Sequence, residues 1–390
     1  MRNKKRGDGL RKKKFLIVTS EDWYFCSHRL PMAKAAQSLG LDVVVVTRAG
    51  AHVQTIKDMG FRHISLRLFT RSNVNILRNF GSILELFWLY FKERPDIVLH
   101  VSLKVSVFGM IALSVLKNTA TLNLVPGVGR LAIVDHALIS ILRIVLWKTL
   151  RLLFRQKGAL LVVQNQDNWD FFVNRGIVAA TQVALVRGSG VDTAVFSPQP
   201  ESEPLTVAFV GRLLWSKGVG ELVEAAEILR RRGVDVKVVL VGVPDYTNWH
   251  YIPLQMLARW QEDGIVEWWG YQDNIVDVWQ RAAIGVFPTF YGEGISKALL
   301  EAGSCARPVI TTNIGSGQDL VVDGVSGLVI PARDPEALSR AIQRLVEGPG
   351  ERMQLGSELR ARIEKQFDNQ HVVATMRKLI SQQLTDAMET

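Results

Sequence analysis

The stretch Phe287-Pro-Thr-Phe-Tyr-Gly-Glu-Gly-Ile-Ser-Lys-Ala-Leu-Leu-Glu301 decides how the rest of the chain is interpreted. It predicts a buried strand over 284–288, a short loop with two glycines, and a helix that starts near Ile295. The first turn of a helix has backbone N–H groups without intrahelical partners, and the helix dipole adds partial positive charge there. We therefore expect this helix start to bind an anionic group such as a diphosphate.

Two carboxylates accompany this helix start. Glu293 lies in the turn, and Glu301 lies eight residues later, about two helical turns along the axis and on roughly the same side. Carboxylates beside an anion site are useful if the phosphate carries a sugar at each end, because each can accept hydrogen bonds from hydroxyl groups. The alternative is that Glu293 only favours the helix dipole and that Glu301 is a solvated helix residue.

Composition limits the class of protein. The length of 390 residues predicts two domains, with three as the alternative, and the apolar content of 48% is enough for separate cores. The two cysteines, Cys26 and Cys305, are too few for a disulfide framework or a cysteine metal site and indicate a reducing compartment. We expect no secretion signal, because the basic run over 1–14 is not followed by an apolar signal region.

The formal net charge of +10 is unevenly distributed. Residues 1–200 hold 28 Lys and Arg against 12 Asp and Glu, whereas residues 201–390 hold 19 against 25. A basic N-terminal half favours an acidic partner, which is a nucleic acid, a membrane surface or a phosphorylated substrate. The alternative for residues 1–14 is a solubilising tail.

The order of predicted elements indicates an α/β protein. Strands alternate with helices from Lys14 onward, with 21–29 predicted as a loop, and a second alternating series starts after three prolines within 198–204. The expected organisation is a basic disordered tail (1–14), an N-terminal Rossmann-like domain (15–197), a linker (198–204), a C-terminal Rossmann-like domain (205–371) and a last helix (372–390) that packs back on the first domain. Such domains bind ligands in the cleft between the carboxyl ends of their strands.

The apolar segment 138–155 has two interpretations. Its central charges make a membrane span costly. Arg143, Trp147, Arg151 and Arg155 recur every four residues, a pattern typical of a helix that lies on an anionic membrane. The alternative is a core helix with one basic face.

Two cations follow a predicted strand end in the second domain. If that strand neighbours the strand over 284–288, Arg212 and Lys217 face the diphosphate that the helix binds. Charge-assisted hydrogen bonds are worth roughly 1.5–3 kcal/mol each. They would stabilise a departing nucleoside diphosphate, which gains charge as its bond breaks.

Taken together, these motifs resemble the family 4 retaining glycosyltransferases of the GT-B fold, in which two Rossmann-like doubly wound domains face each other across a cleft. The matching residues are Gly211-Arg212, Lys217-Gly218, Phe287-Pro288, Gly292 to Ile295, Leu300 to Ala302, Arg307 to Ile310, Asp323-Gly324 and Gly327-Leu328. The match is weaker in the first half, which is similar to bacterial members that build surface polysaccharides on a lipid carrier.

The resemblance implies roles for the residues in these motifs. Glu293 is the expected catalytic residue and contacts the transferred sugar, and Glu301 binds the ribose hydroxyls. The full set expected to bind the donor is Arg212, Lys217, Gly270, Glu293, Gly294, Ile295, Ser296, Lys297 and Glu301. The resemblance also implies a metal-independent enzyme with no cofactor beyond its nucleotide-sugar substrate.

The chain departs from the family pattern at three places. Ser296 replaces the usual proline, Ser216 precedes the lysine where many members have an acid, and Gly127 stands where many have a histidine that touches the sugar. We expect Gly127 to widen the pocket at that point, and donor profiling of Gly127→His tests it.

The acceptor is expected to bind the first domain. The candidate residues are His28, Arg29, Lys104 and Gly127, with Arg29 or Lys104 meeting a lipid-linked phosphate. We therefore predict a glycosyltransferase that moves a sugar, expected from a UDP-sugar, to a lipid-linked saccharide. Its expected place is the cytoplasmic face of the cytoplasmic membrane, on an anionic surface, with no nucleic acid as partner.

Three other functions fit parts of the sequence. A nonhydrolysing sugar epimerase of similar fold would need no acceptor. A nucleic-acid-binding protein would fit the basic pI of 9.7 but not the acidic second half. A dinucleotide-dependent oxidoreductase would rest on Gly127-Val-Gly129 alone, which lacks the third glycine of that fingerprint.

Overall fold

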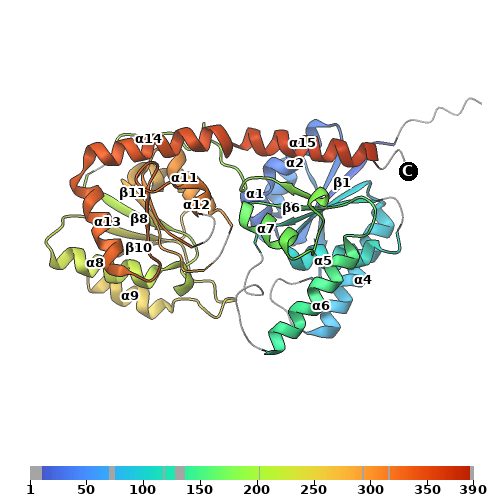
Figure 1. The fold of residues 1–390 in the computed structure, drawn as a ribbon, viewed down its shortest axis with the longest axis horizontal. Helices are drawn as coiled ribbons and strands as arrows, with labels where there is room; N and C mark the ends of the chain where they lie inside the picture. Colours follow the sequence, from blue (N-terminus) through green and yellow to red (C-terminus); the bar gives the residue numbers. More distant parts are fainter. Residues whose placement is uncertain are drawn as a thin grey trace, which may run out of the picture.

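The computed structural model describes residues 11–69, 75–116, 119–127, 137–201, 203–291, 294–314 and 317–386. These residues form two parallel sheets, each covered by helices, and Figure 1 shows the two domains side by side. Both are doubly wound α/β domains, which confirms the predicted fold class.

The N-terminal sheet has seven strands in the order β3-β2-β1-β4-β5-β6-β7. Its strands are β1 (Lys14–Glu21), β2 (Asp42–Arg48), β3 (Arg62–Leu66), β4 (Ile97–Val101), β5 (Ala120–Val125), β6 (Ala159–Val163) and β7 (Val183–Leu185). Its helices are α1 (Asp22–His28), α2 (Leu30–Ser38), α3 (Val53–Asp58), α4 (Ile76–Glu93), α5 (Leu103–Leu113), α6 (Ala137–Leu153) and α7 (Gln166–Asn174). The four consecutive valines of β2 are buried, as expected for a strand covered on both faces.

The C-terminal sheet has six strands in the order β10-β9-β8-β11-β12-β13. They are β8 (Thr206–Val210), β9 (Lys237–Val241), β10 (Glu267–Gly270), β11 (Ile284–Phe287), β12 (Val309–Thr312) and β13 (Leu328–Ile330). The helices are α8 (Val219–Arg231), α9 (Leu254–Glu262), α10 (Ile275–Arg281), α11 (Lys297–Ser304), α12 (Gly317–Leu320), α13 (Pro335–Glu347), α14 (Pro349–Gln366) and α15 (Asn369–Asp386). Strands β8 and β11 are direct neighbours, so the loops after them meet at one edge of the sheet.

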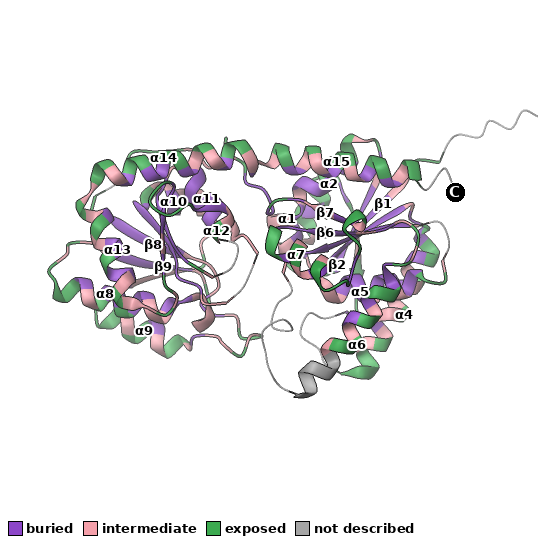
Figure 2. Ribbon diagram, viewed as in Figure 1, coloured by how far each residue is buried: buried purple, intermediate pink, exposed green. Residues whose placement is uncertain are grey.

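Alternate side chains of β1 divide the first domain into two layers. Phe15 and Ile17 pack in the cluster that contains Met32 of α2, whereas Leu16 packs with Leu86 of α4 and Val105 of α5. Figure 1 shows the same division, with α1 and α2 on one face of the sheet and α4, α5 and α6 on the other. Figure 2 shows that the strands are largely buried while the outer faces of the helices are exposed.

The last helix returns to the first domain. Chain segments α14 and α15 run along one side of both domains in Figure 1. Val372, Met376 and Ile380 of α15 are buried in the core cluster of β1 and α2. The C-terminal helix therefore contributes to the core of the N-terminal domain.

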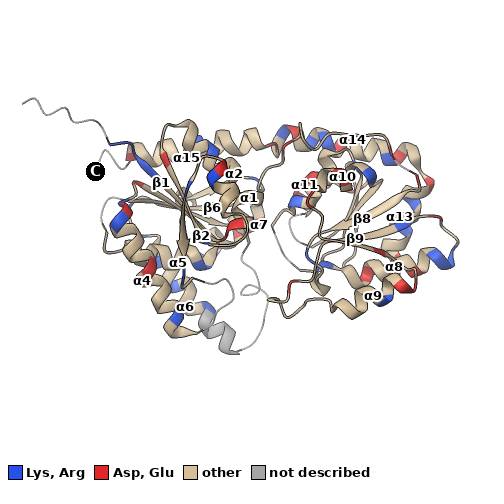
Figure 3. Ribbon diagram, turned by 180° about the vertical axis from the view of Figure 1, so that it is seen from behind, with Lys and Arg blue, Asp and Glu red and all other residues tan. Residues whose placement is uncertain are grey.

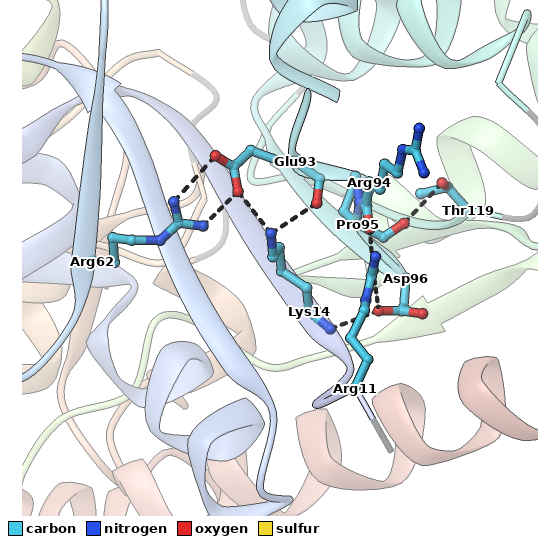
Figure 4. A network of polar contacts seen from close by, with 8 residues as sticks. All are labelled: Arg11, Lys14, Arg62, Glu93, Arg94, Pro95, Asp96 and Thr119. Atoms are coloured by element: carbon cyan, nitrogen blue, oxygen red, sulfur yellow. Dashed lines mark hydrogen bonds and ion pairs between the residues drawn. The ribbon is translucent and has the colours of Figure 1, made fainter. Parts of the chain in front are cut away.

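A network of polar contacts connects the segments at the amino end of the first sheet, as Figure 4 shows. The Glu93 carboxylate, at the end of α4, forms ion pairs with Lys14 and Arg62 at 2.8 and 2.5 Å. The hydrogen bonds from Arg62 lower the pKa of Glu93 to about 2, although burial opposes them. Asp96 accepts the backbone N–H of Lys14 at 2.7 Å. Lys14 thus opens β1, which confirms the predicted start of the first strand and makes this residue part of the domain, not of the tail.

The predicted loop over 21–29 is wrong, because residues 22–28 form helix α1. The Asp22 carboxylate is buried in the first turn and accepts the backbone N–H groups of Trp23 and His52, at 2.8 Å each. An acid at this position stabilises a helix start. The aromatic residues that follow it show no helical period, so the sequence pattern does not predict this short helix.

Of the two interpretations of segment 138–155, helix α6 fits the core helix with one basic face better than the exposed stripe. Trp147 is buried against Phe171 and Phe172, so it does not lie on an exposed basic stripe. Arg151 donates to the carbonyl oxygens of Gly176 and Arg175. In the part of the chain that the structure describes, no helix has the length and hydropathy needed to cross a bilayer.

Candidate functional site

The turn after β8 lies against the loop after β11. The Ser216 carbonyl accepts the Thr289 hydroxyl at 3.1 Å and the Phe290 backbone N–H at 3.3 Å. Gly218 has φ +76°, and a Cβ there would lie 2.0 Å from the Pro288 carbonyl oxygen. Only glycine accepts both this conformation and this approach, so the close contact between the two loops depends on Gly218.

Helix α11 begins at Lys297, two residues later than the sequence predicts. Ser296 is its N-cap residue and has an extended conformation, but its hydroxyl forms no capping hydrogen bond. The side chain at the helix start therefore leaves the first-turn N–H groups to other acceptors. Gly292 and Glu293 lie outside the described residues, so the predicted contact of Glu293 with the transferred sugar stays a prediction.

The start of α11 also meets the first domain. The ammonium group of Lys297 donates to the carbonyl oxygen of Ser27, which lies in α1. A Cβ on Gly294 would lie 2.6 Å from the Pro126 carbonyl oxygen, and one on Gly127 would lie 3.7 Å from the backbone nitrogen of Gly294. The structure thus brings Gly127, predicted on the acceptor side, next to Gly294, predicted on the donor side.

His28 lies within electrostatic reach of four cations from the two domains at this junction. The pKa of His28 is lowered well below its ordinary value, first by burial and then by the positive charges of Arg29, Lys297, Arg212 and Lys217. His28 is therefore neutral near pH 7. Of the predicted set, four cations are thus brought together around His28, which produces a positive junction between the domains.

Arg29 is the most deeply buried of these cations. It is fully buried, and its Nη2 group donates to the Tyr24 hydroxyl at 2.5 Å. Its Nε and Nη1 atoms are buried without a hydrogen-bond partner among the described residues. The ring of Tyr24 stacks on His28 with 4.5 Å between centroids, which holds both residues in place. Buried guanidinium N–H groups without partners favour an anionic ligand, because leaving them unpaired is costly.

Arg212 has one acidic neighbour that the sequence analysis did not identify. Its Nη1 atom lies 2.7 Å from a carboxylate oxygen of Asp245, which belongs to the loop after β9. Asp245 has no motif around it, and only the order of the strands brings it close. It positions the guanidinium at the edge of the junction, where 37% of the Arg212 side chain is exposed.

Glu301 is buried on α11, one turn after Lys297. Burial raises the pKa of Glu301 to about 7, although the charge of Lys297 opposes the rise. Burial likewise lowers the pKa of Lys297, and the positive charge of Arg29 acts in the same direction. Near neutral pH the Glu301 carboxyl is thus partly protonated, so its capacity to accept hydrogen bonds depends on pH.

The remaining donor residues belong to the same edge of the second sheet. The Gly270 carbonyl, at the end of β10, accepts the Gly242 backbone N–H at 2.7 Å. A Cβ on Gly242 would lie 1.9 Å from the Gly211 carbonyl oxygen. Ile295 packs against the apolar cluster under α11. The ends of β8, β9 and β10 are thereby held close together beside the junction.

The neighbours of Lys104 differ from those of His28 and the four cations at the junction. Its ammonium group lies 5.4 Å from the ring centroids of both Phe69 and Phe108. Burial lowers the pKa of Lys104, and the positive charge of Arg78 contributes. The structure therefore places it at the start of α5, beside the start of α4.

As for metals, no three His, Cys, Asp or Glu side chains among the described residues are placed to share an ion.

The chain is similar in sequence to known glycosyltransferases. Residues 204–348 match the family model described as glycosyl transferases group 1. The chain is 25% identical over 368 residues to the N,N'-diacetylbacillosaminyl-diphospho-undecaprenol alpha-1,3-N-acetylgalactosaminyltransferase of Campylobacter jejuni, and the match covers 90% of this chain and 94% of that protein. It is 28% identical to the capsular polysaccharide biosynthesis glycosyltransferase CapM of Staphylococcus aureus, over 43% of this chain and 44% of CapM.

Solved structures show the same two-domain fold. The sucrose-phosphate synthase of Thermosynechococcus elongatus superposes with a TM-score of 0.76 at 18% identity, covering 95% of this chain and 99% of that one. The Anabaena protein HepE in complex with UDP-glucose gives a TM-score of 0.75 at 17% identity, covering 95% of this chain and 99% of that one. At these identities the likeness concerns the fold.

Proposed function

Since residues 204–348 form a group 1 glycosyltransferase domain and the chain is a glycosyltransferase of the GT-B fold, we propose that it transfers a sugar from a nucleoside diphosphate donor to a lipid-linked saccharide in polysaccharide synthesis. The observation that carries this proposal is the positive junction that Arg29, Arg212, Lys217 and Lys297 form around the neutral His28. Phosphate groups are the anions that such a site would take from both substrates.

On the donor side, we assign the diphosphate to the edge formed by Arg212, Lys217 and the start of α11. The two cations and the helix start would stabilise the charge that develops on the departing nucleoside diphosphate. The HepE structure holds UDP-glucose, and by analogy we assign UDP as the nucleotide here. Glu301 would accept hydrogen bonds from ribose hydroxyls and Glu293 would hold the transferred sugar, with retention of its anomeric configuration and without a metal ion.

On the acceptor side, we assign a phosphate of the lipid-linked saccharide to Arg29. This side chain has two buried N–H-bearing atoms without partners, and it lies on the N-terminal domain. The Campylobacter relative carries an undecaprenol diphosphate acceptor in its name. A lipid acceptor of this chemistry would bring the enzyme to the cytoplasmic face of a membrane.

A donor screen tests the proposal. UDP-sugars are supplied together with detergent-solubilised polyprenyl-diphosphate saccharides, and mass spectrometry follows the acceptor. We expect the acceptor mass to increase by one sugar residue with at least one donor. A donor that changes without any acceptor would instead indicate an epimerase.

The Glu293→Ala variant tests the site within the same assay. We expect it to lose transfer while keeping the melting temperature of the wild type. Glu358→Ala is the matched control, because Glu358 is exposed on α14. Transfer by Glu293→Ala at the wild-type rate would overturn the site assignment.

A further inference from the structure

Helix α4 carries an apolar face that the fold does not use. Leu77, Phe80, Leu84, Trp88 and Phe91 recur at steps of three and four residues, and we name this line the α4 ridge. All five side chains are exposed, Leu77 at 82% and Trp88 at 63%. The ring centroids of Trp88 and Phe91 lie 5.9 Å apart, so the aromatic part of the ridge is continuous.

The opposite face of α4 already supplies the core contacts. Ser82, Leu86, Tyr90 and Glu93 are buried, and Leu86 and Tyr90 pack in the cluster under the sheet. A helix on the surface of a soluble domain needs only one apolar face. Exposed apolar patches of this kind mark interaction sites. The ridge is therefore available to a partner.

The surroundings of the ridge are basic. Helices α4, α5 and α6, which form one layer of the domain, contain six Lys and Arg against two Asp and Glu. Both acids are engaged: Glu85 accepts the backbone N–H groups of Arg67 and Leu68, and Glu93 pairs with Lys14. Figure 3 marks Lys and Arg positions in blue along the ribbons of α4 and α6.

We propose that the α4 ridge inserts into the interface of an anionic lipid bilayer, with the exposed basic residues of α4 and α6 binding the headgroups. Large aliphatic and aromatic side chains beside Lys and Arg are the composition of helices that lie in a membrane interface. Tryptophan is favoured at that depth. A second copy of the chain fits less well, because pairing two ridges would bring their flanking cations together.

The position of α4 connects this surface to the proposed reaction. Its first turn lies near Lys104, because Arg78 donates to the carbonyl oxygen of Leu68 and the Lys104 ammonium lies 5.4 Å from the ring centroid of the next residue, Phe69. Lys104 follows the carboxyl end of β4, the edge at which an α/β domain binds its ligand. The proposal rests on the proposed function in one respect: a lipid-linked acceptor held by this bilayer would approach the phosphate site at Arg29 along the edge of the sheet that carries Lys104.

Co-sedimentation with vesicles tests the ridge. The full chain is mixed with vesicles of phosphatidylcholine and phosphatidylglycerol, or of phosphatidylcholine alone. We expect binding to the anionic vesicles that falls about tenfold or more in the double variant Phe80→Ser and Trp88→Ser, because two large apolar side chains are removed. Leu254→Ser with Met353→Ser is the matched control, since both residues are exposed on the second domain.

Several results would overturn the proposal. One is that the wild-type chain does not sediment with anionic vesicles. Another is that the ridge variant sediments with them as the wild type does. A third is that the wild type is a dimer that does not bind vesicles, and that the ridge variant is a monomer. Stabilisation by UDP is measured separately, without vesicles. It confirms that the ridge variant is folded, and its absence in the wild type would count against the proposed function and not against the ridge.

Discussion

At the scale of the residue, Gly218 determines how closely the donor loops approach. Its backbone has a left-handed conformation, and a Cβ at this residue would lie 2.0 Å from the Pro288 carbonyl oxygen. We predict that Gly218→Ala costs about 2 kcal/mol or more of unfolding free energy, from conformational strain and overpacking, and that it weakens UDP binding. Chemical denaturation and UDP titration measure the two effects.

Gly233→Ala is the control for this prediction. Gly233 has φ +72°, and a Cβ there would meet nothing within 4 Å. This variant should therefore show only the conformational cost, about 1 kcal/mol, with UDP binding unchanged. Equal losses of stability in the two variants would show that the contact with Pro288 has no energetic weight.

The buried carboxyl of Glu301 predicts a pH dependence. Because burial raises its pKa to about 7, the carboxyl loses its proton between pH 6 and pH 8 and becomes a better acceptor for ribose hydroxyls. We expect the UDP affinity of the wild type, relative to that of Glu301→Gln, to rise about tenfold over this range. The ratio of the two affinities cancels the effect of the ionisation of UDP, because that effect is the same for both proteins. A ratio that does not change with pH would contradict the role of Glu301.

The sequence predicts the basic residues of this junction better than their partners. Arg212 and Lys217 belong to a motif at a strand end, so their proximity to the loop after β11 follows from the strand order. Asp245 and Tyr24 belong to no motif: Asp245 reaches Arg212 from the loop after the neighbouring strand β9, and Tyr24 reaches Arg29 across the end of α1. Pairings of this kind require three-dimensional coordinates.

At the scale of the element, long and periodic segments were predicted well and short helices were not. The run of four valines in β2 and the apolar period of helix α13 are patterns from which a strand and a helix can be predicted. Helix α1 was predicted as a loop, and α10 and α12 were not predicted. Short helices have too few turns for a hydrophobic period, and local hydrogen bonds such as those of Asp22 determine them instead.

Helix α15 provides a prediction about elements. Met376 and Ile380 are fully buried against the N-terminal domain, although they lie near the end of the chain. We expect Met376→Ala and Ile380→Ala each to cost about 2–5 kcal/mol of unfolding free energy. Urea denaturation measures it.

Met353→Ala in α14 is the comparison for α15, because 73% of Met353 is exposed. Its effect should remain within about 0.5 kcal/mol. If the α15 variants were as stable as Met353→Ala, the helix would not contribute to the core of the first domain.

At the scale of the whole molecule, the sequence predicts two α/β domains and a ligand between them but not how the domains touch. The contact of Lys297 with the Ser27 carbonyl and the approach of Gly294 to Pro126 join residues that lie far apart in the chain. Such contacts cannot be predicted from periodicity or spacing, because they depend on how the two folded domains are placed relative to each other. They make the positive junction a property of the whole molecule.

Calorimetric titration of UDP tests the central claim most directly, with the wild type, Arg212→Gln, Lys217→Gln and Arg340→Gln. Arg340 is exposed on α13 and serves as the control. A charge-assisted hydrogen bond is worth roughly 1.5–3 kcal/mol, so each of the two site variants should bind UDP at least about tenfold more weakly than the wild type and the control. Equal dissociation constants for all four proteins, or no UDP binding by the wild type, would contradict the account.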